Sequence, residues 1–342
     1  MHHYRRRNQS GAALLAVLWV IALLIGLVAG ASLLLTQDLD SAAAKRQIFR
    51  ARMVAEGALN IALNPQVNLG DPLLKRVLSE DEAYEVQIIG EGGRLDPNKL
   101  LGVSPPSPVP GAPPLPPPGT NGEDVLVRVF MQWGMKLDQA KKLIAAMKDW
   151  VDDGPGTNPN GAESKEYGNN GMPFDRPFRS LEEMALVRGM QEVEMAYPEW
   201  RTWFSIYAGA TFDLKAAKPE VVVAVTGCQM RQAQALHARF LGRDGVLGTE
   251  DDPTLTVNEA LGMLGITGPA ASTGFYEVTS QTKRYVVRVR IGDLERELSA
   301  VAQGPPPTPG GGGGPTNILW MGEANPIKET SEAPVLGGRI TR

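Results

Sequence analysis

One polar stretch of this chain carries the side chains best suited to metal chemistry. Its carboxylates and amides follow one another closely, at Asp149, Asp152, Asp153, Asn158, Asn160 and Glu163. Carboxylate, amide and backbone carbonyl oxygens are the ligands that calcium prefers. Glu163 is the twelfth residue counted from Asp152, as in an EF-hand loop, but the sixth is Thr157, where that motif requires glycine. The set therefore fits either a calcium site outside the EF-hand family or a solvated loop whose aspartates cap helices.

A second acidic turn spans Arg243 to Asp252. Its aspartates are Asp244, Asp251 and Asp252, and clustered carboxylates repel one another unless a cation or solvent screens them. A calcium ion and a solvent-exposed turn are equally compatible with this pattern. We treat the three aspartates as second-rank candidate ligands.

Catalytic chemistry is disfavoured by the composition. The chain has three histidines, His2, His3 and His237, and one cysteine, Cys228, so neither a histidine-based zinc centre nor an intramolecular disulfide is expected. Cys228 follows an apolar run and is expected to be a small buried hydrophobe. No Walker sequence is present, and no helical pattern follows the glycine tract Gly310 to Gly314 to hold a phosphate. We expect no enzyme activity.

Nucleic acid is also disfavoured as a partner. The chain has 34 basic and 38 acidic residues, a balance that gives no basic footprint. Leu186 to Met190 has the form of a helix-hairpin-helix, whose backbone amides can hold phosphate in a DNA-uptake protein. It is surrounded by acids that would repel phosphates, Glu182, Glu183, Glu192 and Glu194. A hairpin kept for packing is the better interpretation.

An uncharged segment, Gly11 to Leu35, follows the basic residues Arg5 to Arg7. It determines on which side of a membrane the candidate residues lie. About twenty apolar residues are enough to cross a bilayer. The positive-inside rule puts the N-terminus in the cytoplasm and the remainder of the chain across the membrane, which is the periplasm of a Gram-negative bacterium.

Glycine at position 11, between the basic flank and the apolar run, stands where prepilin peptidases cut. Cleavage there would leave Ala12 as the first residue and keep the apolar helix. Two alternatives remain: a secretory signal peptide with its exit at Ala29-Gly30-Ala31, which would leave a start at Ser32, and a plain single-pass anchor.

The helix is predicted to continue out of the bilayer to about Leu63. Apolar residues recur at steps of three and four from Ala44 to Ala62, and the pattern stops at Asn64-Pro65 because the residue before proline avoids helical conformation. A rod from Ala12 to Leu63 would be about 80 Å long. The outer half carries an apolar stripe that needs a sheet to lie against.

Strand patterns occur in two groups. Alternating residues predict one strand at Tyr84 to Ile89, and the others lie far along the chain, at Phe275 to Ser280, Tyr285 to Ile291 and Leu294 to Val301, with a hairpin turn at Gly292-Asp293. The intervening chain has helical periodicity at Val125 to Trp133, Leu137 to Trp150, Leu181 to Val187, Gln191 to Ala196, Pro219 to Val225, Met230 to Phe240 and Asn258 to Leu264. The fold class is therefore α+β: a long N-terminal helix packed on a small antiparallel sheet, with a large all-helical domain inserted between strands.

Composition divides the chain further. We expect a leader (1–11), a transmembrane helix (12–35), the outer part of the helix with the first strand (36–103), a Pro-rich linker (104–121), an inserted helical domain (122–272), C-terminal strands that complete the domain of the first strand (273–303) and a Gly/Pro-rich tail (304–342). Within the tail, Ile318 to Met321 is a short apolar element that either adds an edge strand or simply packs.

Four stretches in this order resemble the K-type minor pseudopilins of bacterial type II secretion systems. They are the cleavage region from Gly11 to Leu15 with Val17-Leu18-Trp19; the segment Gly93 to Leu100; Asp149 to Asp153 with Asn160 to Glu163 and Tyr167; and Phe178 to Gly189 followed by Phe212 to Leu214 and Ala217 to Val221. The resemblance covers most of the chain from Gly11 to about Trp320. The Pro-rich and Gly-rich tracts are longer than this family leads one to expect.

This resemblance implies a pilin-like, non-enzymatic subunit at the pseudopilus tip, which supports export of folded proteins from the periplasm. It implies cleavage by prepilin peptidase, methylation, and partners among the other minor pseudopilins, the major pseudopilin and the inner-membrane assembly platform, with the outer-membrane secretin or exoproteins as further contacts. We expect partners to contact mainly the Ala44 to Ala62 helix face and the sheet. The resemblance also implies calcium binding, with Asp149, Asp152 and Glu163 as candidate ligands. A type IV pilus minor pilin and a DNA-uptake protein are the alternatives.

Ala16 is the fifth residue after the expected cut. Ordinary pilins have a glutamate there that pairs with the amino terminus of a neighbouring subunit, and a carboxylate in lipid costs about 2.5–3.5 kcal/mol without a partner. The absence of this glutamate indicates that no other subunit is added above this one in the pseudopilus, as the family's tip position implies. Alternatively, Ala16 is simply a lipid-facing residue.

Overall fold

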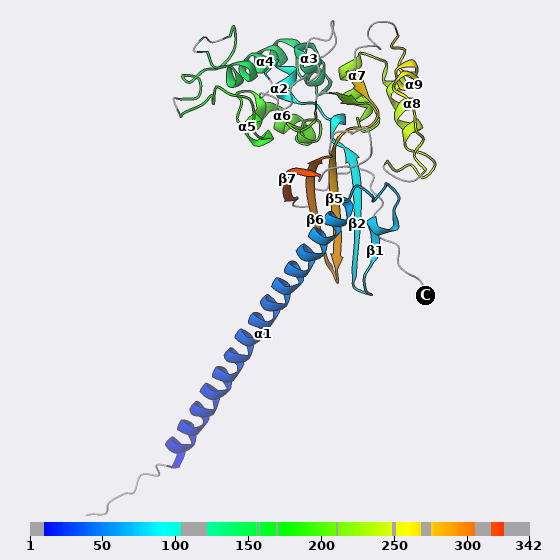
Figure 1. Ribbon diagram of the computed structural model, residues 1–342. Helices are drawn as coiled ribbons and strands as arrows, with labels where there is room; N and C mark the ends of the chain where they lie inside the picture. Colours follow the sequence, from blue (N-terminus) through cyan, green and yellow to red (C-terminus); the bar gives the residue numbers. More distant parts are fainter. Residues whose placement is uncertain are drawn as a thin grey trace, which may run out of the picture.

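The computed structural model describes residues 10–103, 122–154, 156, 158–168, 170–209, 211–247, 251–267, 275–304 and 316–324. The predicted leader up to residue 9, the Pro-rich linker and most of the tail lie outside this range. Figure 1 shows three parts in succession: a long helix, a sheet beside its outer end, and a group of shorter helices beyond the sheet.

The long helix α1 runs from Ser10 to Ala62 without interruption, close to the predicted bounds. It ends one turn before Pro65, where the amide of Leu63 donates the last helical bond to the carbonyl of Leu59 at 2.9 Å. Its segment Leu14–Ala31 has a mean hydropathy of 2.8 and no buried residue, which makes it long and apolar enough to cross a membrane.

The main sheet has the order β1-β2-β5-β6-β7 and is antiparallel throughout. Its strands are β1 (Lys75–Val77), β2 (Glu82–Gly90), β5 (Thr282–Ile291), β6 (Leu294–Gln303) and β7 (Asn317–Ala324). Strands β2 and β5 pair directly, with Val86 opposite Val287, although the whole helical domain lies between them in sequence. The predicted insertion between strands is therefore confirmed.

The first core forms where α1 lies on this sheet. Small residues of α1, among them Ala51, Ala55 and Ala58, allow the helix to approach the strands closely, and Leu59 packs with Val287 and its neighbours. Burying a side chain such as leucine contributes about 1.5–3 kcal/mol. The chain's own sheet thus covers most of the Ala44 to Ala62 stripe. Ala44 and Ile48 of the stripe stay exposed, and the expectation that partners contact this helix face and the sheet stays a prediction.

The second core belongs to the helical domain. Its helices are α2 (Pro97–Leu100), α3 (Gly122–Gln132), α4 (Leu137–Val151), α5 (Leu181–Ala185), α6 (Met190–Ala196), α7 (Pro219–Thr226), α8 (Met230–Phe240) and α9 (Val257–Met263), with 3₁₀ turns η2 (Glu91–Gly93) and η3 (Pro198–Thr202). Trp150, Trp200 and Phe130 are fully buried at its centre. Half-buried Cys228 packs against its edge.

Some strands differ from the sequence pattern, and one open alternative is decided. The strand expected at Phe275 to Ser280 is reduced to β4 (Tyr276–Glu277), which pairs in parallel with β3 (Phe212–Asp213) instead of joining the main sheet. Tyr276 is part of the helical domain's core. Strand β1, after the 3₁₀ turn η1 (Pro72–Leu74), was not predicted. The apolar element at Ile318 to Met321 lies in β7 and forms the sheet edge beside β6.

Both cores begin at or after Ala51, and the apolar segment Leu14–Ala31 is fully exposed. A chain starting at Ser41 therefore retains every contact of the two cores. We use this form for the solution experiments proposed below.

Candidate functional site

The first acidic stretch begins in the last turn of α4. Asp149 is fully buried there, and Asp152 caps the helix C-terminus. The loop folds back so that Asn158 donates to Asp149 Oδ1 twice, from its backbone N at 2.9 Å and from Nδ2 at 2.5 Å. The same Nδ2 lies 3.4 Å from Asp152 Oδ2. Farther along, the ring of Tyr167 packs edge-on against Trp150, so the loop is anchored at both ends.

Each of the three first-rank candidate ligands has one carboxylate oxygen without a hydrogen bond. The buried atoms are Asp149 Oδ2, Asp152 Oδ1 and Glu163 Oε1. A buried acceptor left unpaired costs about 1–3 kcal/mol, and more when it is charged. Three such oxygens in one loop suit a cation, which would satisfy them together.

The electrostatics of the loop also favour a bound cation. Burial, together with the neighbouring charge of Asp149, raises the pKa of Asp152 above its ordinary value. Burial and the charges of Asp149, Asp175 and Asp152 likewise raise the pKa of Glu163. Both pKa values are raised mainly by burial and further by the neighbouring negative charges, and a bound divalent cation would oppose both effects.

The loop backbone is shaped to approach Asp149. A Cβ added at Gly161 would clash with the Asp149 carboxylate, so only glycine allows this approach. The preceding Asn160 has a left-handed backbone with φ of 70°, a conformation that asparagine tolerates better than most residues. This explains the local sequence Asn160-Gly161 in physical terms.

The structure changes which aspartates are plausible calcium ligands. Asp153 is exposed, in contrast to buried Asp149, whereas Asp175, which the sequence pattern did not single out, acts electrostatically on both Asp152 and Glu163. Within the described residues, no three His, Cys, Asp or Glu side chains converge to a metal site as they stand. A cation here therefore requires the carboxylates to draw closer together, and the unpaired buried oxygens are the stronger observation because each must otherwise be neutralised or hydrated.

The second acidic turn is held by protein contacts. Asp251 Oδ2 accepts hydrogen bonds from the backbone N of Arg243 at 2.6 Å and of Asp244 at 3.2 Å. Asp244 in turn accepts from Val246 N at 2.8 Å, and Asp252 forms an ion pair with Lys215 at 2.9 Å. These bonds satisfy at least one oxygen of each aspartate, so the turn is a weaker candidate for a cation than the first loop.

The residues of the expected processing site lie at the start of the long helix. Gly11 and Ala12 fall within the first turns of α1. Ala16 is exposed on the same helix, and no described residue of the apolar window Leu14–Ala31 is buried by the rest of the protein.

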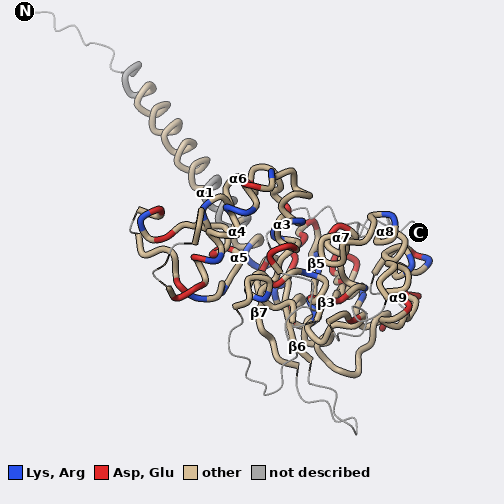
Figure 2. Tube along the Cα trace, turned by 90° about the horizontal axis from the view of Figure 1, so that it is seen from above, with Lys and Arg blue, Asp and Glu red and all other residues tan. Residues whose placement is uncertain are grey.

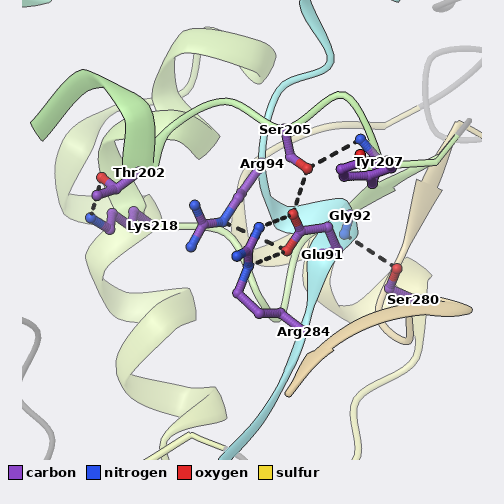
Figure 3. A network of polar contacts seen from close by, with 9 residues as sticks. All are labelled: Glu91, Gly92, Arg94, Thr202, Ser205, Tyr207, Lys218, Ser280 and Arg284. Atoms are coloured by element: carbon purple, nitrogen blue, oxygen red, sulfur yellow. Dashed lines mark hydrogen bonds and ion pairs between the residues drawn. The ribbon is translucent and has the colours of Figure 1, made fainter. Parts of the chain in front are cut away.

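A second polar centre joins the sheet to the helical domain (Figure 3). Glu91, in the turn after β2, is fully buried. It accepts from Arg284 of β5, with Nε at 2.8 Å and Nη2 at 2.5 Å, and from the hydroxyl of Ser205 in the helical domain. Arg94 approaches the same carboxylate at 3.8 Å. Burial alone would raise the pKa of Glu91, but Arg94 and Arg284 hold it below its ordinary value.

Sequence reasoning missed this centre. Glu91 stands in a glycine-rich turn, where an acid is normally solvated, and Arg284 is one of several alternating cations in a strand pattern. Their partnership joins residues 193 positions apart. The two glycines after Glu91 were the one available signal: in the structure, a Cβ at Gly93 would clash with the backbone of Ala216 and Ala217, so the turn lies directly against the helical domain.

The suspected helix-hairpin-helix is present as the pair α5 and α6. Gly189 between them has φ of 99°, which favours glycine. Basic and acidic residues are interspersed over this domain, without a continuous basic stripe (Figure 2). This distribution is typical of a hairpin used for packing.

Comparison with known proteins gives two findings. Residues 111–197 match the family model described as Type II secretion system (T2SS), protein K. The fold matches a chain of the crystal structure of the GspK-GspI-GspJ complex from the type 2 secretion system of enterotoxigenic Escherichia coli, with a TM-score of 0.53 and 14% identity, over 84% of this chain and 99% of the other. No curated protein sequence matches.

The family match lies in the part of the chain that contains α3, α4 and the first acidic loop. The structural match extends to most of the remaining chain and shows the shared fold. Together they confirm the predicted resemblance to the K-type minor pseudopilins and the predicted α+β fold.

Proposed function

We propose that this chain, which carries the protein K domain of type II secretion systems, is the minor pseudopilin at the tip of a pseudopilus and supports export of folded proteins from the periplasm. The observation that carries the proposal is the family match within a helical domain inserted between strands of a pilin-like sheet. A type IV pilus minor pilin is not expected to have this insert. The work is mechanical and recognitional, without a chemical reaction.

Before processing, we propose that α1 spans the inner membrane, with the N-terminus in the cytoplasm and both folded domains in the periplasm. Prepilin peptidase then cuts after Gly11, and the retained helix leaves the bilayer during assembly. The experiment is N-terminal sequencing of the mature chain isolated from cells that express prepilin peptidase. A start at Ala12 supports the proposal, and a start at Ser32 would make the mature chain a soluble periplasmic protein and overturn it.

The proposed partners are other minor pseudopilins, as in the complex whose fold this chain shares. We assign their contact to the face of α1 that the sheet leaves uncovered, where Ile48, Phe49 and Met53 are 42%, 66% and 48% exposed. Strand β7 lies near the end of this helix: Thr316, just before β7, donates to the carbonyl of Leu63, just after α1, and the pKa of Arg52 is raised by Glu56 and, to a smaller extent, by Glu323 of β7. Phe49→Ala should weaken co-purification with the partner pseudopilins, whereas Val77→Ala, an equally exposed residue on β1 at 64%, should not.

The tip position rests on Ala16. A glutamate there would need a partner in the membrane or in a neighbouring subunit. If the chain is the first subunit, Ala16→Glu leaves pseudopilus assembly unimproved and reduces membrane insertion. Increased incorporation of the variant along the pseudopilus shaft would contradict the tip assignment.

We further propose that the loop from Asp149 to Glu163 binds calcium. Asp149, Asp152 and Glu163 would hold the ion through the oxygens that accept no hydrogen bond, and Asp175 adds negative charge nearby. The ion would supply charge neutralisation and a rigid loop. Asp153, Asp244, Asp251 and Asp252 remain second-rank ligands.

The calcium proposal is tested by isothermal titration of residues 41–342 with calcium chloride. Asp152→Asn together with Glu163→Gln should abolish the heat of binding, because two of three carboxylates lose their charge. The matched control, Asp251→Asn, changes one carboxylate of the second turn and should leave the first binding event intact. Unchanged uptake in the double variant would remove this loop as the calcium site.

A further inference from the structure

The helical domain has a hollow that neither the pseudopilus assembly nor the calcium loop accounts for. It measures about 520 Å³ and lies between α4, the loop after it and the α5–α6 hairpin. Its size falls within the range of about 300–1,000 Å³ that is usual for ligand sites. The apolar part of the wall comes from Met135, Leu143 and Ala146, and the hairpin contributes Gly189.

The hollow is built by fixed contacts on both sides. A Cβ at Gly189 would lie 3.4 Å from Leu143 Cδ1, so the hairpin sits directly against α4. The backbone N of Arg188 donates to the hydroxyl of Tyr167 at 3.0 Å, which joins the hairpin to the acidic loop. These bonds hold the walls in place before any ligand arrives, and preorganisation of this kind lowers the cost of binding.

Two cations line the hollow without ion-pair partners among the described residues. Lys142 of α4 and Arg188 of the hairpin are exposed wall residues, and neither lies within an ion-pair distance of a carboxylate in the described part of the chain. Some other cations of this domain do form ion pairs, among them Lys148 with Glu123, Arg176 with Glu183 and Arg201 with Glu194. The wall carries one acid, Glu192, so the two cations leave it with a net positive charge.

We propose that this hollow, named here the α4–hairpin pocket, binds a peptide segment of a partner protein that presents a carboxylate next to an apolar side chain. The carboxylate lies between Lys142 and Arg188, where charge-assisted hydrogen bonds are about twice as strong as neutral ones. The apolar side chain packs against half-buried Met135 and the small exposed parts of Leu143 and Ala146. The inference deepens the proposed function, since it gives the helical domain of a tip subunit a defined means of recognising another protein.

The charge distribution favours a peptide over a nucleic acid. A polyanion needs a run of cations to follow its phosphates. Here the two cations are isolated, and Glu192 lies in the wall while Glu182 and Glu194 lie on the neighbouring helices. A single carboxylate can sit between the cations without approaching these acids as closely as an extended phosphate chain must.

The test is fluorescence anisotropy with residues 41–342 and a fluorescein-labelled peptide that alternates leucine and glutamate. A matched peptide has glutamine in place of glutamate. The acidic peptide should bind, the glutamine peptide should bind at least about tenfold more weakly, and added salt should weaken the acidic peptide, as expected for charged contacts.

Two variants locate the binding. Lys142→Glu with Arg188→Glu should weaken the acidic peptide by at least about tenfold. The matched control is Lys141→Glu with Lys136→Glu, the same charge change at two exposed positions that are not part of the pocket wall. Circular dichroism verifies that both double variants are folded.

Equal affinity for the two peptides, or an equal loss in both double variants, would overturn the proposal. Tighter binding of a labelled DNA duplex than of the acidic peptide would also overturn it and favour a nucleic-acid hairpin. The measurement uses the isolated chain and neither processing nor added calcium, so its failure is distinguishable from failure of the N-terminus and calcium tests, although Asn160 and Gly161 of the acidic loop also line the pocket.

Discussion

Replacement of Glu91 by glutamine should destabilise the junction between the sheet and the helical domain. Glu91 is fully buried, and the side chain of its partner Arg284 is 18% exposed. Removing one charge of a buried pair leaves the other uncompensated and costs about 3–5 kcal/mol. Because glutamine still accepts hydrogen bonds from Arg284 and Ser205, we expect the lower end, about 3 kcal/mol.

The assay is urea unfolding of residues 41–342, followed by tryptophan fluorescence, since Trp133, Trp150, Trp200 and Trp203 report on the helical core. With a denaturant dependence of about 2 kcal/mol per M, the midpoint of Glu91→Gln should fall by about 1.5 M. Glu297→Gln is the control. It breaks the ion pair with Arg288 on the sheet, whose side chains are 27% and 31% exposed, and should cost no more than about 1 kcal/mol.

The pH dependence gives a second check. The folded-state pKa of Glu91 lies below its ordinary 4.5, so its stabilisation is present above that value and is lost as the pH falls through the folded pKa. The difference between the wild type and Glu91→Gln should be complete at neutral pH and shrink below about pH 4.5. Equal midpoints for the two proteins at neutral pH would refute the argument that this carboxylate holds the domains together.

Three further predictions concern single residues. Burial raises the pKa of Asp96, the N-cap of α2, from 3.8 to about 6, so the wild type should gain stability as the pH falls from 6 toward 3.8; Asp96→Asn keeps the cap and should lose this gain in urea titrations across that range. Gly161→Ala should lower the melting temperature and calcium affinity because its Cβ clashes with Asp149, whereas Gly154→Ala, with no atom nearer than 3.9 Å, should change neither. Leu59→Ala should cost about 2–5 kcal/mol in urea unfolding through the cavity left under the sheet; a cost below 1 kcal/mol, about that of a surface site, would contradict the packing of α1 described here.

Local patterns were sufficient for most elements. The helix that ends before Pro65, the hairpin at Gly292 and the helices of the inserted domain all follow from periodicity and breakers, because these effects act between residues close in sequence. Pairing was harder to predict. Tyr276 and Glu277 alternate like a strand of the sheet, yet they pair with β3, since a two-residue strand carries no information about its partner.

The candidate site, too, was predicted from the sequence only in part. The sequence by itself determined the apolar helix, the acidic loop and its candidate ligands, because hydropathy and charge are properties of residue types. Only the tertiary structure decided that Asp149, Asp152 and Glu163 each bury an unpaired oxygen while Asp153 is exposed, and that Asp175 joins them. It alone brought Glu91 to Arg284 and placed Lys142 and Arg188 around one hollow. Burial and long-range proximity depend on how separate elements pack, and no short stretch of chain encodes that packing.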